Sequence, residues 1–209
     1  MATAHTLSSH ARTGAWWLFI FLWSSAAYAH VGHGSTGSGG FLDGLLHPVT
    51  GLDHVVAMVA VGLWGAQLGA PAIWILPITF PLVMAVGGFL GVIGVPLPGV
   101  VVGVALSGVV LGSFVALSLR PPLWVAAMVV AAFAIFHGHT HGTALPLSGE
   151  PLAYGAGFVV ATGLLHVCGI AIGTLNRWPL GTRVIRAGGV FIAATGFVFL
   201  GLHLGVIGR

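Results

Sequence analysis

Six long apolar runs fill most of this chain and decide what it can fold into. Only 4% of the 209 residues are charged, whereas a soluble domain carries about 25%, and so few charges cannot solvate a globular surface. Each run can cross a hydrocarbon core about 30 Å thick as a helix that rises about 1.5 Å per residue. The predicted fold is therefore an all-α integral membrane protein with six transmembrane helices. The spans are expected at residues 45–68, 72–93, 97–118, 122–142, 152–174 and 184–206.

The first 29 residues have the pattern of a secretory signal peptide. Arg12 supplies the positive charge, an apolar stretch follows at 15–23, and the sequence AYA at 27–29 matches an A-x-A cleavage site. The alternative is an uncleaved first helix, which the sequence leaves open. Residues 30–44 are expected to form a periplasmic His- and Gly-rich segment ahead of a six-helix transmembrane transport domain at 45–206.

Arginine placement predicts the orientation of the spans, because cytoplasmic loops carry the excess of positive charge. Arg120 lies between the third and fourth runs, and Arg177, Arg183 and Arg186 lie near the connection between the fifth and sixth. Both connections are on one side of the membrane, which is expected to be cytoplasmic. The chain is therefore predicted to be a multi-pass protein of the bacterial inner membrane with its mature termini in the periplasm. Its net charge of +3 rests on six basic and three acidic residues and indicates no nucleic-acid partner.

Glycines recur four residues apart in several of the runs. This spacing places small residues on one helix face and lets two helix backbones approach closely in a membrane. Helix packing is the expected role of these glycines. The pairs are Gly65 and Gly69, Gly87 and Gly91, Gly99 and Gly103, Gly108 and Gly112, and Gly169 and Gly173.

Histidines and one acid interrupt the apolar runs, where a buried polar group without a partner costs several kcal/mol. The first run contains HPVTGLDH at 47–54, and the fourth ends in FHGHTHG at 136–142. Counting about 1.5 Å per residue from the outer boundary of each run gives each of these side chains a depth in the membrane. The side chains ordered by this depth are called the ladder. Ionisable residues inside a membrane are functional by default, although each histidine taken alone could be structural. From the outer mouth inward, the ladder is His47, His139 and His141, then His137, then Asp53 and His54, and last His166.

The spacing of the first motif predicts which of its side chains converge. His47 and His54 are seven residues apart and share one face of a continuous helix. Asp53 points elsewhere on such a helix, unless Pro48 and Gly51 distort the turn and re-aim it.

The second motif has the same kind of pattern. His137 and His141 are four residues apart on one helix face. His139 points away from them unless Gly138 or Gly142 breaks the helix. The fourth run is therefore expected to present two histidines, and at most three, to the first.

The donor set favours a borderline divalent metal. Imidazole suits nickel, cobalt, copper and zinc, whereas magnesium and calcium need mostly oxygen ligands, which the runs lack. Asp53 could bind the metal or could orient an imidazole from behind. Ligands spread through the membrane are typical of a path that admits and releases an ion.

These two motifs and the order of a signal sequence followed by six spans resemble the HupE/UreJ family of nickel and cobalt permeases. The residues that carry the resemblance are 47–69 and 136–142, with GLLH at 163–166. The resemblance implies uptake of Ni²⁺ or Co²⁺ as substrate, with no prosthetic group, for enzymes such as hydrogenase, urease or cobalamin-dependent proteins. The chain departs from the family at Ala144, where the family pattern H-G-x-E has an acid. Glu150 is a possible substitute.

Two other functions are open to the same residues. A haem-binding membrane protein would use histidine pairs as axial ligands. A metal-dependent intramembrane enzyme is disfavoured, because the sequence has no H-E-x-x-H motif. There is also no G-x-x-x-x-G-K-[ST] motif, so the chain itself does not hydrolyse ATP and implies no ATPase subunit. The expected partners are the metal ion and the lipid bilayer, and the oligomeric state stays open.

Overall fold

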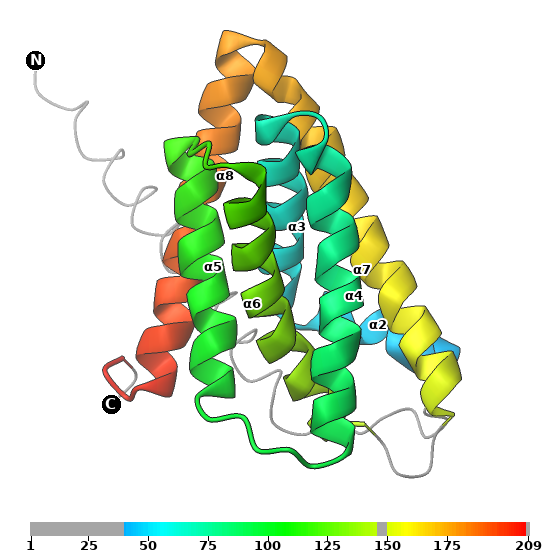
Figure 1. Ribbon diagram of the computed structural model, residues 1–209. Coiled ribbons are helices and arrows are strands. Elements are labelled where there is room, and N and C mark those ends of the chain that lie inside the picture. The colour runs from blue at the N-terminus through cyan, green and yellow to red at the C-terminus, as the bar shows by residue number, and fades with distance from the viewer. Residues whose placement is uncertain (1–39, 146–149, 208–209) are drawn as a thin grey trace, which may run out of the picture. The chain divides into compact units, whose positions relative to one another are not determined.

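The computed structural model describes residues 40–145 and 150–207. Every regular element in these two ranges is a helix (Figure 1). The predicted signal peptide and most of the expected 30–44 segment lie outside the described residues. The helices are α2 (Phe41–Thr50), α3 (Leu52–Leu68), α4 (Ala72–Val92), α5 (Val100–Leu117), α6 (Leu123–Thr143), α7 (Pro151–Gly173), the short 3-10 helix η1 (Thr174–Arg177) and α8 (Pro179–His203).

Five helices are long and apolar enough to cross a membrane, and α2 with α3 makes a sixth span if the two are counted together. Four of the predicted spans match α4 to α7 within three residues at either end, and α8 begins five residues before its predicted start. Large apolar side chains such as Trp74, Leu82, Trp124 and Phe197 are exposed on the outside of the bundle. Such surfaces suit a lipid environment, so the protein is a multi-pass membrane protein.

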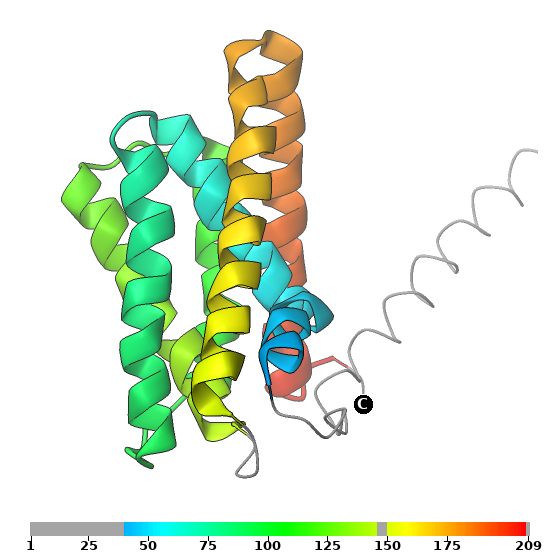
Figure 2. The same ribbon diagram turned by 90° about the vertical axis from the view of Figure 1, so that its right-hand side faces the viewer.

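The first predicted span, 45–68, is not one helix. It is broken at Gly51, where α2 and α3 meet at 86°. Gly51 has an extended backbone (φ −97°, ψ 110°), and α2 lies across one end of the bundle (Figures 1 and 2). Helix α2 begins at Phe41, within the segment expected at 30–44. Depths counted along an unbroken first helix are therefore wrong.

The connections between the helices gather at two ends of the bundle (Figure 1). The α3–α4, α5–α6 and α7–α8 connections lie at one end, called here the arginine end, which carries Arg120 and Arg177. The α4–α5 connection and α2 lie at the opposite end, called here the α2 end. This arrangement agrees with the predicted grouping of the arginines on one side.

Close backbone packing joins the helices in pairs: α4 with α6, α5 with α8, and α3 with α7, which also packs on α2. A Cβ atom on Gly87 would lie 2.9 Å from the Cα atom of Ile135, and one on Gly169 would lie 3.0 Å from that of Gly62. The packing role predicted for these glycines is confirmed. Gly69 and Gly99 differ, because they lie outside the helices with positive φ and open space around them.

Helix α3 is also held by polar contacts at the arginine end. The Trp64 indole N–H donates to the Leu119 carbonyl (2.9 Å), and the Gln67 amide donates to the Val115 carbonyl (3.0 Å). Both acceptors lie at the C-terminal end of α5, Val115 in its last turn and Leu119 two residues beyond it. These two contacts therefore fix α3 against that end of α5.

Adjacent glycines in α8 provide a test of this packing. A Cβ on Gly189 would lie 2.8 Å from the Gly112 carbonyl oxygen, whereas a Cβ on Gly188 would meet no atom within 4 Å. Replacing glycine by alanine improves helix propensity equally at both positions, by up to about 1 kcal/mol. Gly189→Ala is expected to lower the thermal midpoint of the detergent-purified protein, because overpacking costs about 1–3 kcal/mol. Gly188→Ala should keep or raise it, and equal midpoints would contradict the packing role.

Candidate metal path

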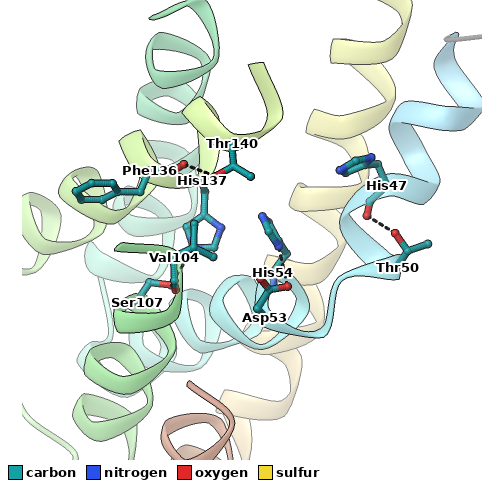
Figure 3. Close-up of polar contacts among 9 residues, drawn as sticks. All are labelled: His47, Thr50, Asp53, His54, Val104, Ser107, Phe136, His137 and Thr140. Atoms are coloured by element: carbon teal, nitrogen blue, oxygen red, sulfur yellow. Dashed lines mark hydrogen bonds and ion pairs between the residues drawn. The ribbon is translucent and has the colours of Figure 1, made fainter. Parts of the chain in front are cut away.

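Four imidazoles from three helices form a continuous row near the α2 end. The ring of His47 on α2 lies 4.8 Å from that of His141 on α6, between centroids. His141 lies 4.5 Å from His54 on α3, and His54 lies 4.8 Å from His137 on α6. Figure 3 shows His54 standing between His137 and His47. The break at Gly51 permits this, because α2 and α3 approach α6 from different directions.

Asp53 orients His54. One carboxylate oxygen, Oδ1, accepts the His54 backbone N–H (3.0 Å) and lies 2.9 Å from ring atom Nδ1. An ionised carboxylate can only accept hydrogen bonds. Nδ1 of His54 therefore carries the proton, and Nε2 is the lone-pair nitrogen of the ring. Of the two roles left open for the acid, the geometry matches the orienting one.

Ser107 on α5 orients His137 in the same way. Its hydroxyl lies 2.6 Å from the Val104 carbonyl and 2.8 Å from His137 Nε2. The carbonyl can only accept, so the hydroxyl donates its one proton there and accepts from Nε2–H. Nδ1 is then the lone-pair nitrogen of His137, and it has no hydrogen-bond partner.

His141 occupies the centre of the row. It is buried, and neither of its ring nitrogens has a hydrogen-bond partner. Its ring packs against Phe158 of α7 at 4.2 Å as well as against the two neighbouring histidines. A buried imidazole without partners is costly, which favours a ligand for this side chain.

The structure separates the other two predicted residues from the row. Helix α6 stays unbroken, and His139 therefore points away, with Nε2–H donating to the Val95 carbonyl at 2.7 Å. His166 is buried on α7, and the ring of Phe80 contacts both it and His137. The order of the ladder also changes, because His54 contacts both His137 and His141 instead of lying below them.

The rings of the row pack edge to face and do not surround one point. In the described ranges, no group of three or more His, Cys, Asp or Glu side chains has the arrangement of a metal site. The row therefore brings imidazoles together in neighbouring pairs. An apolar cavity of about 350 Å³ between α4, α6 and α7 reaches His141 at its side.

Comparison with known proteins places the chain in a family. The family model described as HupE / UreJ protein matches residues 18–199. The chain belongs to the HupE/UreJ family. A relative named Protein HupE, from Rhizobium leguminosarum bv. viciae, is 46% identical over 176 residues, which cover 84% of this chain and 91% of the relative. No solved structure matches the chain.

The family match spans both histidine motifs and therefore confirms the resemblance on which they were singled out. Within this HupE/UreJ chain, Ala144 caps the C-terminal end of α6 and is exposed. It lies one turn beyond the His137–His141 stretch at the α2 end.

Sequence reasoning missed two residues. Ser107 is a single hydroxyl in an apolar helix, and Phe80 is one apolar residue among many. Neither has a spacing or composition that distinguishes it from packing residues, and only the placement of α4 and α5 against α6 gives them a role.

The Ser107 contact predicts an effect on metal binding. Ser107→Ala frees the His137 ring to take the other tautomer and rotate, so the affinity of the purified protein for Ni²⁺ or Co²⁺ should fall about 10- to 100-fold. Ser113→Ala is the matched control, because this hydroxyl on the same helix bonds only the Val109 carbonyl (2.7 Å). Isothermal titration of both variants tests this, and equal affinities would rule out the orienting role.

Proposed function

We propose that this HupE/UreJ protein is a permease that imports Ni²⁺ or Co²⁺ through the row His47–His141–His54–His137. The observation that carries the proposal is His141, a buried imidazole without hydrogen-bond partners in direct contact with two others. Imidazole nitrogens are suitable donors for both metals. The imported metal would supply enzymes such as hydrogenase, urease or cobalamin-dependent proteins, and the chain itself catalyses no reaction.

The ion passes between neighbouring pairs of imidazoles. His54 and His137 each keep one lone-pair nitrogen, because Asp53 and Ser107 hold the opposite nitrogen protonated. Because only two protein ligands bind the ion at a time, water fills its remaining coordination positions. Such a site binds weakly enough to release the ion to the next pair, as conduction requires.

The row lies toward the periplasm of a bacterial inner membrane in this proposal. The arginine end faces the cytoplasm, following the positive-inside rule, and both mature termini are periplasmic. His47 is then the first imidazole that an incoming ion meets. His139 donates to a backbone carbonyl and stays a weaker candidate ligand, whereas His166 is a candidate further along the path.

Haem binding is less favoured by the same geometry. The imidazoles of the row touch one another, with centroids 4.5 to 4.8 Å apart. A porphyrin plane between two axial ligands needs a gap that these direct contacts do not leave.

The pair of Asp53 and His54 provides the main test. Asp53→Asn keeps the shape of the side chain and removes the charge that compensates the ion, and His54→Ala removes a donor from the middle of the row. Both variants should lose uptake of ⁶³Ni²⁺ or ⁵⁷Co²⁺ almost completely in cells without other permeases. His203→Ala, an exposed residue at the end of α8, is the control and should transport normally.

Abundance in the membrane must be matched for this comparison, because an altered buried residue can also act through misfolding. Near-normal uptake by Asp53→Asn at matched abundance would mean that the acid has only a structural role.

Position 144 provides a second test. Ala144→Glu restores the family's acid at the exposed end of α6 and adds a negative charge near His141. Local attraction raises the concentration of cations at the mouth. The half-saturating metal concentration should therefore fall while the maximal rate stays similar, and Ala144→Gln should change neither. An equal effect of both substitutions would exclude an electrostatic cause.

A further inference from the structure

Phe80 lies where the row of imidazoles meets His166. It is a fully buried residue of α4. The centroid of its ring is 5.5 Å from that of His137 and 5.4 Å from that of His166, and both contacts are edge to face. An aromatic ring with no lone-pair nitrogen therefore joins the two histidines.

His166 lies deeper in the bundle than His137. It follows Phe158 by eight residues of α7, which is about 12 Å at 1.5 Å per residue. Phe158 contacts His141, and His137 precedes His141 by one turn of α6, or about 6 Å. His166 is therefore about 6 Å farther from the α2 end than His137, with Phe80 in contact with both.

The surroundings of His166 suit a cation. The ring is buried, and neither nitrogen makes a hydrogen bond of ordinary geometry. The Pro77 carbonyl is close enough to the ring to act as a hydrogen-bond acceptor for it. Helix α4 cannot use this carbonyl, because Pro81, four residues on, has no N–H to donate. The His166 imidazole and the Pro77 carbonyl thus lie together on the far side of Phe80.

We propose that Phe80 is a hydrophobic gate that separates the outer row of imidazoles from an inner binding station made by His166 and the Pro77 carbonyl. The proposal rests on the function proposed above. An apolar constriction blocks hydrated ions because it excludes their water. An ion that reaches His137 therefore waits until the Phe80 ring moves.

The packing of the helices indicates how the ring moves. Phe80 and His137 belong to the tightly packed pair α4–α6, and His166 belongs to the pair α3–α7. A shift of one pair against the other carries Phe80 past His166. Pro77 and Pro81 flank the gate and remove two hydrogen bonds from α4, and such positions are where helices bend.

The chain has one cysteine, Cys168, so a single replacement, Cys168→Ser, gives a background for thiol labelling. His166→Cys in this background is treated with a charged, membrane-impermeant methanethiosulfonate from the α2 end. Labelling should be slow with Phe80 present and faster by about an order of magnitude or more with Phe80→Ala, because the seal is lost. Phe114→Ala removes the same ring from the contact with Trp64 and should leave labelling slow.

Two further variants complete the test. Phe80→Leu keeps an apolar seal and should label slowly, and Phe80→Val should be intermediate, which keeps the gate testable if Phe80→Ala does not fold. Rapid labelling of His166→Cys with Phe80 intact would overturn the proposal. So would equal rates for Phe80→Ala and Phe114→Ala.

Labelling requires no metal transport, so the two proposals fail separately. If the wild-type protein carries no Ni²⁺ or Co²⁺ into proteoliposomes, the proposed function is wrong whatever the labelling shows. If it carries metal and Phe80 variants do not change labelling, only the gate is wrong. With both correct, Phe80→Ala should also raise the downhill metal flux above that of Phe114→Ala.

Discussion

The break at Gly51 is the constraint on which the candidate metal path depends. It creates a helix N-terminus inside the first span, and such a terminus carries the equivalent of about half a positive charge. Asp53 lies in that first turn, so the backbone stabilises its carboxylate within an apolar bundle. The carboxylate in turn accepts the His54 N–H and holds the imidazole. A straight helix would bury Asp53 in the middle of a turn, where all backbone N–H groups are already bonded.

Glycine packing determines how the candidate metal path lies between the helices. Each helix pair uses glycines to bring its two backbones together and forms one packing unit. The imidazole row alternates between them: His47 and His54 belong to the α2–α3–α7 side, and His137 and His141 belong to α6. Every step along the row therefore crosses from one unit to the other, and a small shift between units would change the distances between neighbouring rings.

The sequence predicted the features that follow from the length of its apolar runs and from the spacing of residues along a helix. Apolar runs define the spans, and the four-residue spacing of His137 and His141 placed both on the row. The sequence did not predict the 86° bend between α2 and α3 at Gly51, because α2 also packs against α7, and the sequence gives no sign of that contact. Ser107 was missed for a similar reason, since its hydroxyl acquires a role only through its contact with His137, thirty residues away.

Charge balance explains why a row of neutral imidazoles suits passage better than storage. A divalent ion inside the bundle would need two compensating charges, and Asp53 supplies one beside His54. The imidazole lone pairs would replace water but bring no charge, in a medium where ions are costly. A second carboxylate at the row would deepen the site and slow release, whereas an acid at the exposed mouth would only attract more ions to it.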